Sequence, residues 1–323
     1  MNSTPNTGNA MPERHLPVLV ADIGGTRARF ATFAPSLHPV ILNSCEVPTA
    51  ICSGLDELTR LAVNTLCPGN LEAIVYAAAG FQSDPYTCTG KNIPWAVDTR
   101  TVTMPVKKLL INDFVAQAAS VCVLPCIEHS VVQQGKGTDR PVAVVGAGTG
   151  LGKCAIANPN SPSLRPVFMP SEGSWADFPF KGAEEYAFAS FLEQRGIAPY
   201  TDNVVSGPGL KSLYEFTTKK QCTGHLCHAD LAATGAFDTF ARMYARVCKN
   251  FMLDTLAFGG LYLAGGVVKS LPQLATSPAF LTELCTCGLL SRHFEEVPIA
   301  IMHDDSSGLY GAFVYYQRVC RFE

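Results

Sequence analysis

Charged residues are scarce in this chain of 323 residues, since Asp, Glu, Lys and Arg make up only 16% of it. The net charge is −3, and no run of basic residues occurs. Proteins that bind nucleic acids need a basic patch or stripe to neutralise the phosphates, so we expect no nucleic-acid partner. With 47% hydrophobic residues, the composition is instead typical of a globular enzyme with a large buried core.

Long hydrophobic runs are missing as well. The longest apolar stretches, such as residues 73–79 and 142–145, have only the length of a strand. A helix needs about 20 apolar residues to cross a bilayer, so we expect no membrane partner. Residues 1–17 are polar and lack the apolar segment of a signal peptide, which predicts a disordered leader on a cytoplasmic protein.

Paired metal-ligand motifs are also lacking, although the chain has 13 cysteines. Most of them are scattered, as Cys122 and Cys248 are, which favours buried thiols that pack as small hydrophobic groups. Structural zinc is the less favoured alternative at two clusters. Residues 222–228 crowd their donors into one segment, and Cys285 and Cys287 have no second pair nearby.

Two segments repeat the same pattern of strand, glycine-rich turn and strand. The first covers residues 16–33, and the second covers residues 142–157. Each turn is expected to open a new α/β unit, so the sequence predicts two similar halves. The length of the chain also favours two domains, because one hydrophobic core rarely grows to this size.

Further strands are predicted over residues 71–79, 106–111 and 261–264. Helices are expected to begin after Asp113, at Glu184 and at Ser306. The strongest helical periodicity runs from about residue 230 to 258, and Gly259 and Gly260 are expected to end that helix. Strands that alternate with helices predict the α/β class.

Glycine-rich turns suit phosphate binding because backbone N–H groups can approach the anion where no Cβ intervenes. The spacing excludes three common phosphate loops. A Walker loop needs a glycine at position 147 and a Ser or Thr at position 154, where this chain has Ala147 and Cys154. A dinucleotide-binding fingerprint opens a helix, whereas the segment 146–152 leads into a strand. The glycine loop of a protein kinase needs a His-Arg-Asp segment further along the chain, and none follows. What remains is a pair of phosphate clamps, with hydroxyls from Thr26 and Thr149.

The motifs resemble, in order, those of the bacterial glucokinase family, which belongs to the hexokinase–actin–Hsp70 superfamily. They are the segments 22–29, 111–114, 146–152, 206–210 and 263–266. The resemblance covers residues from about 18 to 315. It implies an α/β fold with two ribonuclease H-like domains and an intervening cleft, the actin-like ATPase architecture. The small domain would comprise residues 18–111 plus 305–323, and the large domain residues 112–304.

The same resemblance implies an ATP-dependent kinase that phosphorylates a hexose, most simply glucose to glucose 6-phosphate, with ATP and Mg²⁺ as cofactors. Asp22 is placed to hold the ATP-bound Mg²⁺, directly or through water. The residues expected to bind ATP are Asp22, Gly24, Gly25, Thr26, Gly148, Thr149, Gly150, Gly265 and Gly266. The sequence leaves a homodimer open.

Asp113 is the predicted catalytic base. It lies just past a strand end, where ligands gather in open α/β sheets, and phosphoryl transfer to a hydroxyl needs a group that accepts the proton. The adjacent Asn112 can donate to and accept from neighbouring ring hydroxyls. Taken alone, Asn followed by Asp after a strand is also typical of a helix cap.

Glu172 matches the sugar-binding glutamate of the family, and two nearby positions depart from the family pattern. Trp175 replaces a histidine; its indole can fill core space or stack on a sugar, and we expect core packing. Asp202 stands at the position of a sugar-contacting glutamate and reaches about 1.5 Å less far. The residues expected to bind the sugar are therefore Asn112, Asp113, Glu172, Trp175 and Asp202. These departures leave open a kinase for another hexose, or a catalytically weak sugar-binding regulator on the same fold.

Overall fold

The structure is a computed structural model. It describes residues 16–320, apart from residues 35, 37, 38, 67, 68, 91, 162, 223–225 and 227. Residues 1–15 of the predicted leader therefore lie outside the described part of the chain.

The first sheet contains five strands in the order β3-β2-β1-β4-β8. Their bounds are β1 (Val18–Ile23), β2 (Arg27–Phe33), β3 (Ile41–Pro48), β4 (Ala73–Ala78) and β8 (Lys107–Asn112). β1 to β3 form an antiparallel meander, whereas β4 and β8 run parallel to β1. β4 is buried along its whole length, which explains why its sequence is a continuous apolar run and does not alternate.

The second sheet has the order β12-β11-β10-β13-β14-β9. Its strands are β9 (His129–Gln133), β10 (Val142–Ala147), β11 (Leu151–Ala157), β12 (Val167–Ser171), β13 (Gly260–Ala264) and β14 (Ile299–Met302). β10 to β12 are antiparallel, and β13 and β14 continue the sheet parallel to β10. The arrangement of the first sheet is thus repeated, with β9 added antiparallel to β14. The prediction of two similar halves is confirmed for the sheets.

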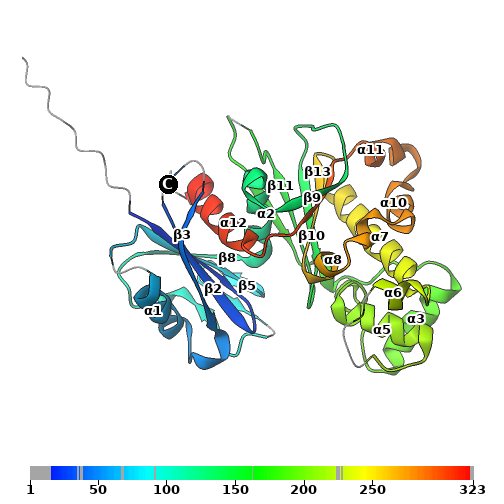
Figure 1. The fold of residues 1–323 in the computed structure, drawn as a ribbon, viewed down its shortest axis with the longest axis horizontal. Helices are drawn as coiled ribbons and strands as arrows, with labels where there is room; N and C mark the ends of the chain where they lie inside the picture. The colour runs from blue at the N-terminus through cyan, green and yellow to red at the C-terminus, as the bar shows by residue number, and fades with distance from the viewer. Residues whose placement is uncertain are drawn as a thin grey trace, which may run out of the picture.

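Helices α2 (Asp113–Ser120) and α12 (Ser307–Tyr315) lie between the two sheets (Figure 1). One hydrophobic core joins them to both sheets, with members such as Val20, Ala116, Val144 and Phe313. The two helices approach so closely that a Cβ on Gly311 of α12 would overlap the carbonyl oxygen of Ala116. α2 carries the predicted base at its first position, so this helix pair fixes the site relative to both sheets.

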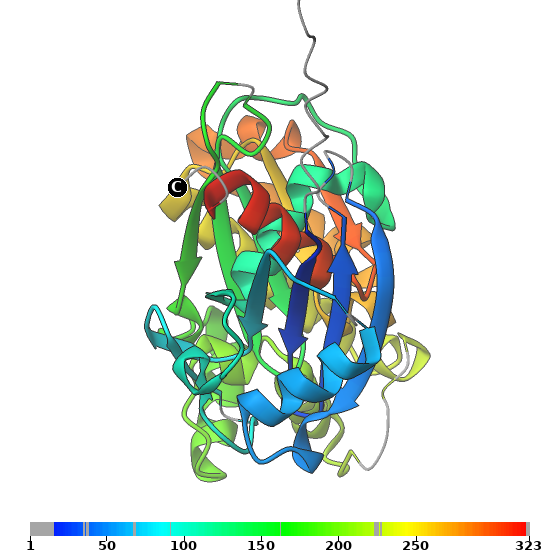
Figure 2. The ribbon, with the colours of Figure 1, turned by 90° about the vertical axis from the view of Figure 1, so that its left-hand side faces the viewer.

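Other helices cover the outer faces of the sheets. α1 (Leu55–Leu66) lies in front of the first sheet in Figure 2. The second sheet is covered by α7 (Ala236–Thr255), whose apolar face packs into the largest core. The remaining α-helices are α3 (Gly182–Gln194), α4 (Thr201–Val204), α5 (Gly207–Thr218), α6 (His228–Ala232), α8 (Gly266–Ser270), α9 (Gln273–Thr276), α10 (Pro278–Cys285) and α11 (Ser291–Glu295).

Shorter elements complete the chain. A small sheet inserted between β4 and β8 contains β5 (Phe81–Asp84), β6 (Thr87–Thr89) and β7 (Val97–Asp98). Short helical segments are η1 (Thr49–Ile51), η2 (Thr99–Thr101), η3 (Val121–Cys126), η4 (Gly173–Trp175), η5 (Gly288–Leu290) and η6 (Tyr316–Cys320). Among the described residues, no helix is both long enough and apolar enough to span a membrane.

The prediction of one helix over residues 230–258 was wrong. Two helices, α6 and α7, are separated by Gly235, which has a φ of 74°. α7 ends at Thr255, because Leu256 adopts the left-handed conformation with a φ of 50° before Gly259 is reached. The apolar periodicity belongs to α7 alone.

Candidate active site

The first glycine turn joins β1 to β2. Gly24 N–H donates to the carbonyl of Arg27 at 3.0 Å and closes the turn. Gly25 has no room for a side chain, because a Cβ there would lie 2.7 Å from the carbonyl oxygen of Asn92. Thr26 follows and is exposed. A tight turn with an accessible hydroxyl is the arrangement that the sequence predicted.

The second glycine turn joins β10 to β11. Gly148 N–H donates to the carbonyl of Gly150 at 2.7 Å. A Cβ on Gly148 would find its nearest neighbour at 3.8 Å, the backbone nitrogen of Gly266, and a Cβ on Gly266 would meet nothing within 4 Å. The two backbones therefore face open space on the same side. This opening suits a phosphate or an adenine ring that approaches the backbone closely.

Gly265 brings these two backbones together. Its φ is 87°, in the left-handed region, and a Cβ would overlap the carbonyl oxygen of Ala147. Only glycine fits both conditions. Gly265 therefore has a structural role, whereas Gly266 faces the opening.

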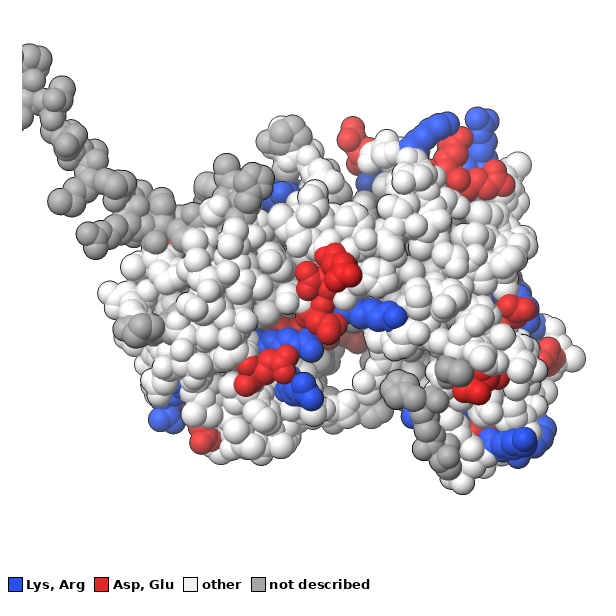
Figure 3. Space-filling view, in the orientation of Figure 1, with Lys and Arg blue, Asp and Glu red and all other residues white. Residues whose placement is uncertain are grey.

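Asp22, near the end of β1, lies in the middle of a charged region. Burial raises the pKa of its carboxyl, and the positive charges of Arg29 and Lys269 partly offset this effect. Lys269 pairs with Asp305 at 2.7 Å, and Arg29 pairs with Glu46 at 2.9 Å. Figure 3 shows acidic and basic side chains gathered near the middle of this face of the molecule. An acid on the strand that leads into the first glycine turn is consistent with the predicted cation-binding role, which stays a prediction.

Asn112 ends β8 and caps α2. Its Oδ1 accepts from the N–H of Phe114 at 2.8 Å, and its Nδ2 donates to the carbonyl of Gly80 at 2.9 Å. The helix-cap interpretation is thus correct for Asn112. The Nδ2 group has two hydrogens, and the bond to Gly80 uses one of them, so Asn112 can still donate a hydrogen bond to a ligand.

Asp113 is the first residue of α2, and its pKa is raised to about 7. Burial is the largest cause, and the negative charges of Asp22 and Glu172 raise the pKa further. The N–H of Phe114 donates to Asp113 Oδ1 at 3.0 Å and opposes the shift. A carboxyl group with a pKa near the working pH is suited to accept and return a proton. The charges of two acids from other segments, Asp22 and Glu172, therefore act on Asp113.

Phe114 ties α2 to the second sheet. Its ring fills the space above Gly152, where a Cβ would overlap the ring, and above Gly146, where a Cβ would lie 2.7 Å from Cζ. The glycines at the two ends of the segment 146–152 therefore make a notch for an aromatic ring. Sequence reasoning missed this role because it treated the whole segment as one phosphate-binding motif.

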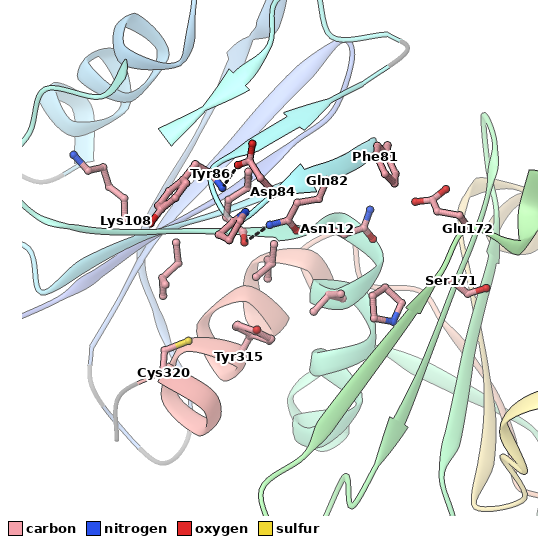
Figure 4. Close-up of a pocket in the computed structure, with 16 residues that line it drawn as sticks. Phe81, Gln82, Asp84, Tyr86, Lys108, Asn112, Ser171, Glu172, Tyr315 and Cys320 are labelled. Atoms are coloured by element: carbon pink, nitrogen blue, oxygen red, sulfur yellow. Dashed lines mark hydrogen bonds between the residues drawn. The ribbon is translucent and has the colours of Figure 1, made fainter. Parts of the chain in front are cut away.

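A cavity of about 680 Å³ lies between β8, β5 and the segment that follows β12. In Figure 4, Asn112, Glu172 and Phe81 lie at one end of it, and Lys108 and Cys320 lie at the other. Asn112 and Glu172, two of the residues expected to bind the sugar, are thus brought together at this cavity; the predicted base, Asp113, directly follows Asn112 in the chain. The exposed ring of Phe81 adds an aromatic face at the same end.

The structure places Trp175 elsewhere than expected. Its side chain is 58% exposed, so the prediction that it packs in the core was wrong. The η4 turn holds it at the surface, where its ring contacts the edge of Tyr200 at 6.2 Å between centroids. Trp175 is not among the residues that line the cavity.

Asp202 lies outside the cavity as well. It is in the first turn of α4, and its Oδ1 accepts from the backbone N–H of Leu151 at 2.6 Å. Asp202 therefore contacts the second glycine turn, and it does not line the cavity that Asn112 and Glu172 line.

The two cysteine clusters give no metal site in the part of the chain that the structure covers. No group of three or more His, Cys, Asp or Glu side chains is placed there to hold an ion. Most of the residues between Cys222 and His228 lie outside the described ranges.

Comparisons with known proteins bear on the family and the fold of this chain. A curated glucokinase of Psychromonas ingrahamii is 27% identical over 93% of this chain and 97% of its own. The solved glucokinase of an Antarctic psychrotroph has a TM-score of 0.75 at 24% identity, covering 92% of this chain and 98% of that one. A solved ROK family glucokinase from Streptomyces griseus, in complex with glucose and AMPPNP, has a TM-score of 0.57 at 18% identity, covering 92% and 97%.

The family model described as Glucokinase matches residues 19–319. This match includes both glycine turns, the acids Asp22, Asp113 and Glu172, and α12. The chain belongs to the glucokinase family.

Proposed function

We propose that this sugar kinase transfers the γ-phosphoryl group of ATP to a hexose, with glucose as the expected acceptor and glucose 6-phosphate as the product. One observation carries the proposal. A carboxyl group with a pKa of about 7, that of Asp113, lies beside a cavity that Asn112 and Glu172 line. Phosphoryl transfer needs such a base aimed at the acceptor hydroxyl.

The proposed architecture is that of the actin-like ATPases, with two ribonuclease H-like domains. The repeated strand order of the two sheets supports it, as does the pair of helices between them. Residues 18–111 and 305–323 would form the small domain, and residues 112–304 the large one. The site then lies where the two domains meet, so that closure around the substrates would exclude water.

On the acceptor side, the residues have separate tasks. Asp113 accepts the proton of the attacking hydroxyl as the bond from its oxygen to the γ-phosphorus forms and the bond from the γ-phosphorus to ADP breaks. Glu172 accepts hydrogen bonds from ring hydroxyls, and the unused N–H of Asn112 donates to one. These contacts hold the hydroxyl in line with the phosphate, and positioning of this kind supplies much of the rate enhancement in phosphoryl transfer.

On the donor side, the two glycine turns face the phosphates. Backbone N–H groups around Gly24 and Gly148 would donate to phosphate oxygens, and Thr26 and Thr149 would add their hydroxyls. Asp22 is the residue that would hold Mg²⁺, directly or through water. Mg²⁺ supplies neutralisation of the charge on the phosphates. Gly266 leaves space for the adenine and ribose.

A coupled assay of ADP release across glucose, mannose, galactose and N-acetylglucosamine tests the proposal. We expect turnover with at least one hexose, and the highest kcat/KM with glucose. ADP release that does not depend on any hexose would identify an ATPase. Hexose binding without ADP release would identify the sugar-binding regulator. This alternative is retained because Trp175 lies at the surface and Asp202 bonds to the backbone of Leu151.

The pKa of Asp113 predicts a pH dependence. Only the ionised carboxylate can accept the hydroxyl proton, so kcat/KM rises with pH and levels off above about pH 7. Well below that value the loss approaches tenfold per pH unit, because the ionised fraction falls in that proportion. Steady-state rates at low hexose, measured between about pH 5.5 and 8.5, check this expectation. A flat profile over that range would show that the proton goes elsewhere.

Gly148→Ala tests the second glycine turn. The added methyl group meets no protein atom closer than 3.8 Å, so the fold should be unaffected. It projects into the space where a phosphate must approach the backbone, and we expect the KM for ATP to rise about tenfold or more. The KM for the hexose and the thermal unfolding midpoint serve as internal controls. An unchanged KM for ATP would make the turn a purely structural hairpin.

A further inference from the structure

We propose that Asp202 is a positioning residue for ATP. It fixes the second glycine turn and, through its neighbours, ties that turn to the segment that carries Glu172. This inference rests on the proposed function, because it takes the turn at 148–150 to bind phosphate. It differs from the expectation by resemblance, in which the side chain at position 202 contacts the sugar.

The contact between Asp202 and the turn is direct and short. Oδ1 accepts from the N–H of Leu151, the first residue of β11, at 2.6 Å. A Cβ on Gly150 would lie 2.8 Å from the same oxygen, so the turn leaves the carboxylate just enough room. A hydrogen bond from a backbone amide to an ionised carboxylate is among the stronger kinds. The carboxylate therefore fixes the turn from the side of α4.

A second hydrogen bond holds the other arm of the turn to the same segment. The N–H of Gly207, the first residue of α5, donates to the carbonyl of Gly148 at 2.8 Å. A Cβ on Gly207 would come within 3.2 Å of that oxygen. The segment 200–207 thus holds the turn at two points, one on each side of Thr149.

The same segment is bonded to the sugar side of the site. Both the N–H and the hydroxyl of Thr201 donate to the carbonyl of Ala176, each at 2.9 Å. Tyr200 forms an antiparallel bridge with Asp177 and contacts the ring of Trp175. Ala176 directly follows the η4 turn, which begins after Glu172. One short segment therefore contacts both the turn expected to hold phosphate and the turn expected to hold sugar.

This arrangement has two consequences. The N–H groups of the turn are preorganised for phosphate, which lowers the cost of ordering them when ATP binds. Hexose bound at Glu172 also restrains the segment that holds the turn, so ATP and hexose should bind with positive coupling. Because Asp202 acts through Leu151, it is a positioning residue and need not touch either substrate.

The test compares variants of the full chain by titration calorimetry with Mg²⁺ and AMPPNP, an ATP analogue that does not transfer its phosphoryl group, with and without glucose. Asp202→Ala removes the acceptor, and we expect the ATP affinity to fall about tenfold or more and the coupling to glucose to be reduced. Glucose affinity should change less than about twofold. Asp202→Asn keeps an oxygen acceptor for Leu151 N–H and should restore most of the ATP affinity.

Two further variants separate the effect of the contact with the turn from the effect of removing an aspartate. Gly150→Ala places a methyl group against Asp202 Oδ1 and should reproduce the ATP defect without changing position 202. Asp238→Ala is the matched control, since Asp238 also lies in the first turn of a helix, α7, but is exposed; it should bind ATP as the wild type does.

Loss of glucose affinity with unchanged ATP affinity in Asp202→Ala would overturn the inference and return this residue to the sugar site. Equal affinities for both ligands in the wild type and Asp202→Ala would also overturn it. A wild type that binds ATP but never phosphorylates a hexose would contradict the proposed function alone, because the calorimetric comparison needs no turnover.

Discussion

Asp113→Ala is expected to lower kcat by about a hundred- to ten-thousand-fold, the range typical of a lost general base, and to leave hexose binding measurable. The physical reason is that Asp113 is the group placed to accept the hydroxyl proton: its pKa is about 7, and it lies beside Asn112 and Glu172. Steady-state kinetics with saturating ATP and hexose give kcat, and calorimetry gives the hexose affinity.

Asp113→Asn keeps the shape of the side chain, so it separates the loss of the base from a disturbance of the start of α2. It should be nearly as slow as Asp113→Ala and should lose the rise in kcat/KM around pH 7. Asp238→Asn, at an exposed position in α7, is the control and should be fully active. If either Asp113 variant kept more than about a tenth of the wild-type rate, another group would have to be the base.

Gly311→Ala is expected to cause the largest loss of stability. Its Cβ would overlap the carbonyl oxygen of Ala116, which is backbone and cannot rotate away. α12 and α2 must then separate within the core that both sheets share, so we expect the free energy of unfolding to fall by about 3 kcal/mol. Activity should fall too, because α2 carries Asp113.

Chemical denaturation measures the loss of stability. Gly54→Ala is the matched control: a Cβ at Gly54 meets nothing within 4 Å, so its effect should stay within about 0.5 kcal/mol. Equal stability of the two variants would contradict the close packing of α2 against α12, and with it the account of how the base is positioned.

The repeated strands and the acid at the start of α2 could be predicted from local signals. Strands buried on both faces appear as continuous apolar runs, as residues 73–78 do, and glycine turns mark where such strands end. Asn112 and Asp113 were predictable because they directly follow such a strand. The end of α7 was not predicted, because the left-handed residue is Leu256 and not one of the glycines that follow it.

Contacts between distant segments could not be predicted. Asp202 bonds to Leu151, 51 positions earlier in the chain, and no periodicity or motif encodes that pair. The notch that Gly146 and Gly152 form for Phe114 depends in the same way on how α2 crosses β10 and β11. Trp175 was expected inside because of its size, but the η4 turn that carries it lies at the surface.

The most direct test of the central claim identifies the product. The wild-type protein is incubated with ATP, Mg²⁺ and glucose, and glucose 6-phosphate is measured with an NADP-dependent dehydrogenase that oxidises only the 6-phosphate, while ADP is measured in parallel. We predict one molecule of glucose 6-phosphate for each ADP, and almost none of either with Asp113→Ala. ADP formation without glucose 6-phosphate, or equal product from the Asp113→Ala variant, would contradict it.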